Sequence, residues 1–189
     1  MGKSNLVTST IHDVHLHTVF DGPRDEAGEL RWSLHHLDRR VLRRGSKKVA
    51  LRYGQSVRQL SLDFAKDLAQ HGVRSLVLRV ELAVRGRVVS RQTVFFTAPR
   101  NLELKPARIE ATLRKAGPAR FELTLASRDF QHAAAFHFRG IGYGAEDNFF
   151  DLYPGTPRRV IVKTARDLPL AQLRQRLETV SLVDSYHSR

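Results

Sequence analysis

The chain has 189 residues, a formal net charge of +13 and no cysteine. These numbers exclude a disulfide-stapled mini-protein and a cysteine zinc site, and they leave room for one large domain or two small ones. Hydrophobic residues make up 41% and charged residues 27% of the chain, which predicts a packed core. No apolar run approaches the roughly 20 residues of a membrane-spanning helix. We therefore expect no membrane partner, and composition leaves the localisation unknown.

Six basic residues are concentrated in the segment LDRRVLRRGSKK, in which we expect Gly45 to form a turn. They are Arg39, Arg40, Arg43, Arg44, Lys47 and Lys48. One interpretation is a candidate polyanion patch at a hairpin tip that contacts phosphates. The other is a solvated strand edge whose like charges discourage aggregation. We favour the edge, because no aromatic platform for nucleic-acid bases accompanies the patch.

The first half of the chain follows the period-two pattern of strands. Residues 1–12 are aperiodic and predict a linker segment. Strands are then predicted around Val14–Leu16, Leu30–Leu34 and Val49–Tyr53, followed by a hairpin of Leu76–Val84 and Val88–Thr97. Between them, Asp63 can cap a short helix over Phe64–His71 that ends at Gly72. The strand pattern also places Trp32 and Tyr53 in the core, which leaves no exposed aromatic platform for a sugar.

The proline-flanked segment Thr97–Pro106 is the predicted domain boundary. Beyond it the pattern predicts strands at Ile109–Leu113, Phe121–Leu125, Ala134–Phe138, Arg159–Lys163 and Thr179–Val183. A helix precedes the last strand, with Asp167 as a cap, Pro169 in the first turn and Leu170, Leu173 and Leu177 on one face. The fold class is therefore all-β: two tandem β-sandwiches over 13–98 and 104–189, with one short helix each.

Five histidines near the start of the chain could in sequence suggest a metal-binding cluster: His12, His15, His17, His35 and His36. Adjacent strand residues point to opposite faces, and no carboxylate is phased with this set, so we predict no metal site. No nucleophile elbow occurs in the chain. The glycines at 140, 142 and 144 predict an irregular loop rather than a phosphate loop, because Asp147 would repel a phosphate. We expect no cofactor.

Glu146, Asp147 and Asp151 could in principle form the carboxylate pair of a glycosidase. Asx residues next to Pro154 and Gly155 more often cap turns, and a small sandwich seldom builds a deep cleft, so we predict no catalytic residue. We predict a type II turn over Tyr153–Thr156 with a positive φ at Gly155.

The residues before this turn have structural roles in the same hypothesis. Phe149 and Phe150 should point to opposite faces, one into the sandwich and one to its outside. Asp147 and Asn148 should accept backbone N–H groups.

The segment EDNFFDLYPG, Glu146–Gly155, resembles the (S/E)DNxFDLxPG signature of the β-mannosidases of glycoside hydrolase family 2. FFTAPRNLEL (Phe95–Leu104) is similar to the junction between the fourth and fifth domains of that family, and TVSLVDSY (Thr179–Tyr186) to its closing strand. GELRWSLHHLDRRVL is similar to the opening strands of its immunoglobulin-like domain. The signature residues that the resemblance covers are Asp147, Asn148, Phe149, Phe150, Asp151, Pro154 and Gly155.

The resemblance implies two immunoglobulin-like domains that follow a (β/α)8 catalytic barrel. The barrel carries the acid/base and nucleophile glutamates of the family, and neither has a counterpart in this chain. The resemblance thus implies a non-enzymatic fragment whose partner is the barrel of its parent, a retaining hydrolase of terminal β-mannosides, with carbohydrate bound only through that parent. The alternative is a free-standing basic module that binds nucleic acid or another polyanion through Arg39–Lys48.

Overall fold

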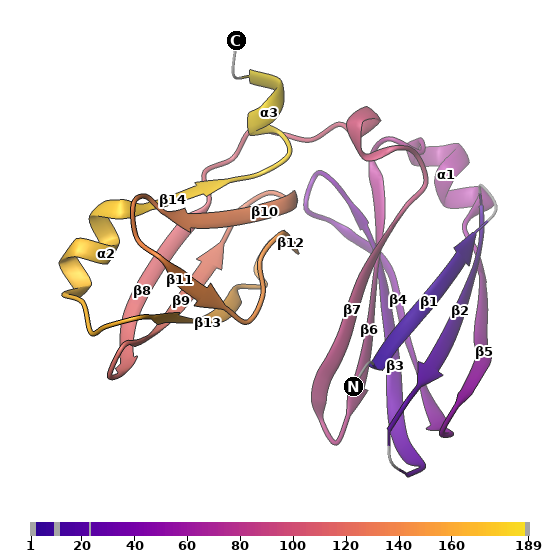
Figure 1. Cartoon of the computed structure of the whole chain (residues 1–189). Helices are drawn as coiled ribbons and strands as arrows, with labels where there is room; N and C mark the ends of the chain where they lie inside the picture. Colours follow the sequence, from indigo (N-terminus) through magenta and orange to yellow (C-terminus); the bar gives the residue numbers. More distant parts are fainter. Residues whose placement is uncertain (1–2, 10–11, 23, 188–189) are drawn as a thin grey trace. The chain divides into compact units, whose positions relative to one another are not determined.

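The computed structural model describes residues 3–9, 12–22 and 24–187. The chain forms two compact units, Met1–Glu103 and Leu104–Arg189, divided within the predicted boundary segment (Figure 1). Each is an antiparallel β-sandwich with few and short helices, so the predicted fold class is confirmed. No helix within the described ranges is long and apolar enough to cross a membrane.

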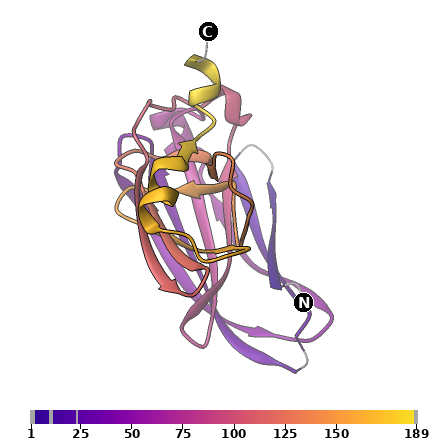
Figure 2. The same cartoon turned by 60° about the vertical axis from the view of Figure 1, so that its left-hand side comes forward.

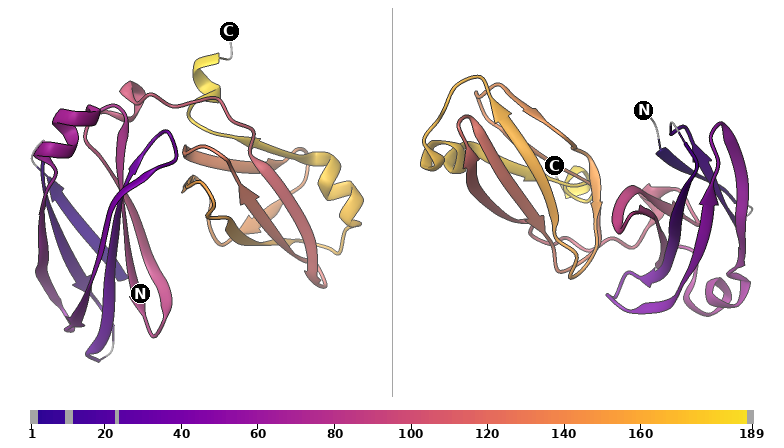
Figure 3. Two further views of the ribbon diagram at one scale, coloured as in Figure 1. Left: turned by 180° about the vertical axis from the view of Figure 1, so that it is seen from behind. Right: turned by 90° about the horizontal axis from the view of Figure 1, so that it is seen from below.

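Unit 1 consists of two facing sheets (Figures 1 and 3). The first sheet has the order β1 (Lys3–Ser9), β2 (Asp13–Phe20) and β5 (Gln55–Asp63). The second has the order β4 (Val41–Leu51), β3 (Glu26–His36), β6 (Leu76–Val84) and β7 (Arg87–Phe95). Helix α1 (Ala65–His71) connects β5 to β6, and the 3-10 turn η1 (Pro99–Asn101) follows β7.

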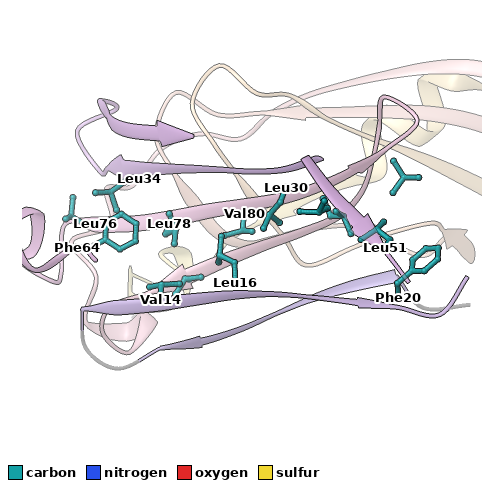
Figure 4. Close-up of a cluster of buried hydrophobic side chains, with 14 of the residues drawn as sticks. Val14, Leu16, Phe20, Leu30, Leu34, Leu51, Phe64, Leu76, Leu78 and Val80 are labelled. Atoms are coloured by element: carbon teal, nitrogen blue, oxygen red, sulfur yellow. The ribbon is translucent and has the colours of Figure 1, made fainter. Parts of the chain in front are cut away.

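The core of unit 1 lies between these sheets, where buried side chains of β2, β3, β4 and β6 point toward one another (Figure 4). Every second residue of β2 is buried, as the period-two pattern predicts. On the other sheet Leu30, Leu34, Leu78 and Leu82 are completely buried. Leu68 closes the end of the sandwich from α1.

The predicted linker over residues 1–12 is wrong for residues 3–9. They form β1, which pairs with β2 from Lys3↔Phe20 to Ser9↔Val14. This pairing satisfies the N–H and C=O groups along one side of β2, and backbone groups pair without a side-chain pattern. For this reason β1 needs no period-two alternation in its sequence, and the strand could not be predicted from such a pattern. Residues 1, 2, 10 and 11 of the predicted linker lie outside the described residues.

Gly45 does not form a turn. It lies in the middle of β4 opposite Trp32, and the chain turns earlier, where Asp38 accepts the Arg40 N–H at 3.2 Å. A Cβ atom on Gly45 would lie 2.8 Å from the Trp32 ring, so the glycine is required by a close approach. The ring is partly buried under β4 and meets Phe64 edge-on at 6.0 Å.

Two further predictions in unit 1 need correction or refinement. Tyr53 is 63% exposed and not in the core, because β4 ends at Leu51 and the chain turns toward Gly54. Asp63 accepts the Ala65 N–H at 2.8 Å, and the helix accordingly begins at Ala65 rather than at Phe64.

Unit 2 also has two sheets. One has the order β11 (Tyr143–Ala145), β13 (Arg158–Thr164), β9 (Arg120–Ala126) and β8 (Glu110–Gly117). The other has the order β12 (Phe150–Leu152), β10 (Gln131–Phe138) and β14 (Leu177–Val180). Helix α2 (Leu170–Arg176) contacts β8 and β10 and is drawn in yellow in Figure 2. The core between the sheets contains Phe121, Leu123, Phe136 and Val162.

The C-terminal part of unit 2 departs from the prediction in two places. Asp167 does not cap α2, because it accepts hydrogen bonds from Lys115 at 2.5 Å and from the Ala119 N–H at 3.2 Å. Pro169 takes the cap position instead. The predicted strand Thr179–Val183 ends at Val180, where Asp184 accepts the Ser181 N–H at 2.6 Å and begins the short helix α3 (Asp184–His187).

The turn predicted over Tyr153–Thr156 is present in unit 2. The Thr156 N–H donates to the Tyr153 carbonyl at 3.0 Å, and Gly155 has φ of +68°. Both features agree with a turn that needs a left-handed residue at its third position.

Gly45→Ala should lower the free energy of unfolding of unit 1 by about 1–3 kcal/mol, because the added methyl group meets the Trp32 ring. Ser46→Ala, at an exposed position on the opposite face of the same strand, should change it by less than about 0.5 kcal/mol. Urea unfolding followed by Trp32 fluorescence measures both, since Trp32 is the single tryptophan. Equal stabilities of the two variants would contradict the close approach.

Gly155→Ala should destabilise unit 2 by about 1 kcal/mol, because alanine is strained at positive φ. Gly142→Ala is the matched control: an added Cβ finds nothing within 4 Å at either position, but only Gly155 has a left-handed backbone. Calorimetry of the two variants gives the comparison. A turn held by other contacts would leave the two melting temperatures the same.

Candidate functional site

The DNFFDLYPG segment lies along the outer side of β10. Its strand β12 pairs with β10 at Gln131↔Leu152 and Ala134↔Phe150, and the register shifts between these two pairs. Within that irregularity Ala133 takes a φ of +51°. The segment therefore pairs with an interrupted strand and has to satisfy backbone groups that a regular ladder would satisfy.

Asn148 replaces a strand partner for β10. Its Oδ1 accepts the Phe136 N–H at 3.1 Å, and its Nδ2 donates to the Phe136 carbonyl at 3.0 Å. The same Oδ1 accepts the N–H of Phe149 at 3.1 Å. One amide side chain thus binds both backbone groups of a core residue and fixes the residue that follows it.

Asp151 holds the bulged part of β10. Its Oδ1 accepts the Ala133 N–H at 3.2 Å and lies 2.7 Å from Nδ1 of His132. Asp151 and His132 are both largely buried, with side chains 17% and 23% exposed. This carboxylate stabilises the irregular backbone at the start of the strand.

Asp147 accepts a hydrogen bond from the Arg158 guanidinium and not from a backbone N–H as predicted. The same guanidinium carbon lies 5.3 Å from the centre of the Phe150 ring. Arg158 therefore connects the loop before β12 to the ring that follows it. Asp147 and Asp151 therefore bind different partners, on β13 and on β10 respectively.

Phe149 and Phe150 lie on opposite sides, as the sequence predicts. Phe150 packs against the core of unit 2, whereas Phe149 is 73% exposed. The backbone of Phe149 is left-handed, with φ of +62°, and not extended. A bulky residue rarely adopts this conformation, which costs on the order of 1–3 kcal/mol and needs support from its surroundings. The Asn148 side chain supplies that support.

The structure divides the six residues of the candidate polyanion patch among different surroundings. Arg39 is exposed in the turn before β4, with φ of +83°. Arg40 pairs with Asp38 at 2.7 Å. Arg43 reaches across the open edge of the sandwich to Asp67 at 2.7 Å, and Lys47 donates to the Gln59 carbonyl at 2.6 Å. Arg43 and Lys47 thus connect β4 to α1 and to β5 and close an edge of the sandwich. The predicted patch is therefore not one continuous cationic tip.

Arg44 and Lys48 lie on the other side of β4. They belong to the outer face, by which we mean the side of the β4-β3-β6-β7 sheet that points away from the core. Strand alternation brings Arg31, Ser33, Arg79, Glu81 and Arg91 to the same face. Reading the linear sequence could not reveal this set, because it comes from four strands whose register is fixed only by folding.

A hollow of about 420 Å³ lies on this outer face. Its lining consists of Glu29, Arg31, Trp32, Ser33, Arg44, Gly45, Ser46, Arg79 and Glu81. Arg31 Nε donates to Glu29 at 2.8 Å, and this hydrogen bond lowers the pKa of Glu29. Burial, with a smaller contribution from Arg79, lowers the pKa of His35 to about 4, so His35 is neutral at neutral pH.

Within the part of the chain that the structure describes, the ring nitrogens of the five histidines considered above do not gather into one group. Nδ1 of His15 lies 3.1 Å from Oγ of Ser61, and Nε2 of His35 lies 2.7 Å from Oγ of Ser33. Nδ1 of His36 lies 2.9 Å from Oδ1 of Asp38. Among the described residues, His12, Asp13 and Asp63 bring their ligand atoms within 4.8 Å of one another. His12 and Asp63 are exposed, and this proximity alone carries no metal assignment.

Comparison with known proteins gives two family matches. The mannosidase Ig/CBM-like domain family matches residues 12–101, and an Ig-fold domain family matches residues 104–185. No curated protein sequence matches the chain.

Solved structures agree with the fold. A β-D-mannosidase from Dictyoglomus thermophilum matches 95% of this chain with a TM-score of 0.81 and 16% identity. The exo-chitosanase CsxA from Amycolatopsis orientalis matches 94% with a TM-score of 0.67 and 12% identity. The chain spans only 21% and 25% of the lengths of these two proteins. The chain therefore belongs to the mannosidase Ig/CBM-like domain family over residues 12–101, followed by a member of the Ig-fold domain family over residues 104–185.

Proposed function

We propose that this chain is the non-catalytic C-terminal part of a β-mannosidase-like glycoside hydrolase. Its two domains pack against a (β/α)8 catalytic barrel and support it. The order of the two family matches and the coverage of a β-D-mannosidase structure over 95% of the chain support this proposal. The parent enzyme hydrolyses terminal β-mannosides with retention of configuration.

The observation that carries the proposal is the exposed ring of Phe149. Among the exposed large hydrophobic residues in the described parts of the chain, Phe149 has the highest exposed fraction, at 73%. A strained backbone conformation at an exposed aromatic residue points to a role outside the sandwich, because such strain is concentrated at functional sites. Asn148 nevertheless fixes this residue through its backbone N–H. We interpret Phe149 as a preorganised anchor for a partner domain.

The surroundings of Phe149 have the composition of an interface hot spot. Phe150 lies under the segment against the core, and the Asp147–Arg158 ion pair lies next to it. An aromatic anchor with a polar rim that excludes water is the usual arrangement at such sites. The barrel would supply an apolar pocket for the ring, and Arg158 has further N–H groups for a carbonyl of the barrel.

Catalysis in the proposed parent comes from the barrel. A retaining mechanism needs two carboxyl groups about 5–5.5 Å apart, one as acid/base and one as nucleophile. Asp147 and Asp151 are engaged by Arg158 and by His132 with Ala133, where they stabilise the loop and the bulge. In this proposal the two domains contribute stability and barrel geometry rather than reacting groups.

Phe149→Ala should weaken association with the barrel by about 10–100-fold and leave the unfolding midpoint of unit 2 within error, because the ring is exposed. Phe150→Ala is the matched control and should instead lower the stability of unit 2. The gene of the proposed parent, or an adjacent gene, should encode the barrel. Calorimetric titration of the separately expressed barrel then gives the affinities. Absence of any such barrel gene would refute the proposal.

The chain alone should release no p-nitrophenol from p-nitrophenyl β-mannoside above background, since the proposed reacting groups belong to the barrel. The assay is run at high protein concentration, with Asp147→Ala as the companion variant. Turnover that follows the purified chain and is lost in Asp147→Ala would show that the signature carboxylates are catalytic.

A further inference from the structure

The outer face of unit 1 carries a row of residues in register across three strands. Ser33 of β3 pairs with Arg44 of β4 on one side and with Arg79 of β6 on the other. Neighbouring strands lie about 4.8 Å apart, so the two arginines start from positions roughly 10 Å apart with the Ser33 hydroxyl between them. Long side chains at this separation can both reach one small anionic group.

The next row holds one of these arginines in place. Glu81 accepts hydrogen bonds from Arg79 at 2.6 Å and from Arg91 at 3.1 Å. Glu29 likewise accepts a hydrogen bond from Arg31 Nε at 2.8 Å. Arg44, by contrast, has no hydrogen-bond or ion-pair partner within the part of the chain that the structure describes. The outer face therefore combines guanidinium groups that carboxylates hold in place, those of Arg31 and Arg79, with the guanidinium of Arg44, which can turn toward a ligand.

The charge of the hollow is positive without being uniform. Arg31, Arg44 and Arg79 line it together with the carboxylates Glu29 and Glu81. His35, which is neutral at neutral pH, lies 2.7 Å from the Ser33 hydroxyl and fixes its position. The volume of about 420 Å³ lies within the range of small-ligand sites.

We propose that this hollow binds a small acidic sugar, with its carboxylate between Arg44 and Arg79. Guanidinium groups match a planar carboxylate through paired N–H donors. The hydroxyl groups of the sugar donate to Glu29, Glu81 and Ser46, which are acceptors that a simple anion would leave unused. The proposal concerns unit 1 only and does not depend on the docking of Phe149.

A nucleic acid fits the same hollow less well. Its phosphates would approach Glu29 and Glu81, whose negative charges oppose a repeated anion. Arg43 and Lys47, which a linear basic patch would offer to the backbone, already bind Asp67 and Gln59. A single carboxylate among several hydroxyl groups suits the mixed charge better.

Titration of the isotopically labelled chain with sodium D-glucuronate, followed by NMR amide shifts, tests the proposal. The shifts should map to the outer-face residues of β3, β4 and β6, with weaker shifts for D-glucose and for acetate at equal concentration. Arg44→Gln should reduce the affinity for glucuronate at least tenfold. Arg159→Gln, at an exposed strand arginine of β13, should leave it unchanged.

Each alternative outcome overturns the proposal. Equal binding of glucose would remove the role of the carboxylate, and equal binding of acetate would remove the role of the sugar. Glucuronate binding that persists in Arg44→Gln, with unit 1 folded as judged by Trp32 fluorescence, would place the ligand elsewhere. A DNA duplex that binds more tightly than glucuronate and depends on Arg44 would identify the face as a polyanion site.

Discussion

The register between β3 and β6 is the constraint on which unit 1 depends. The pairs Leu30↔Leu82 and Leu34↔Leu78 bring buried leucines together on the core side. The same ladder brings Ser33 opposite Arg79 and Arg31 opposite Glu81 on the other side. A slip of one residue would turn the leucines to solvent and the arginines into the core. The hydrophobic core therefore also determines the arrangement of charges on the outer face.

In unit 2, the Asn148 side chain takes the place of a hydrogen-bonding partner strand. β10 carries a bulge near Ala133, and β12 is too short to pair with all of it. Asn148 binds both backbone groups of Phe136 where a longer strand would have done so. An alanine at this position would remove the acceptor of the Phe136 N–H, whereas the Phe136 carbonyl would keep the hydrogen bond from the Tyr143 hydroxyl at 2.9 Å. A buried N–H without a partner costs more than one ordinary hydrogen bond contributes. The irregular pairing of β10 thus explains why a polar residue, Asn148, lies beside Phe149 and Phe150.

Alternation in the sequence was sufficient to predict most strands, because every second residue of a half-buried strand must be apolar. The local preferences of Pro154 and Gly155 were sufficient to predict the Tyr153–Thr156 turn. Alternation failed for β1, which is held by backbone pairing, and the turn expected at Gly45 was wrong because that glycine is required by a ring on the neighbouring strand. The row of Arg44, Ser33 and Arg79 could not be predicted, since sequence gives no register between distant strands.

The pairing of β10 has a consequence for synthesis of the protein. Gln131 and Ala134 pair with β12, whereas residues 135–138 pair with β14 near the end of the chain. On the ribosome, residues 135–138 of β10 therefore lack their β14 partner until Leu177–Val180 have emerged. Unit 1, by contrast, has all its strands once Phe95 has left the exit tunnel. The interval is a period in which nascent unit 2 exposes an unpaired strand, and the folded first unit is already beside it in the chain.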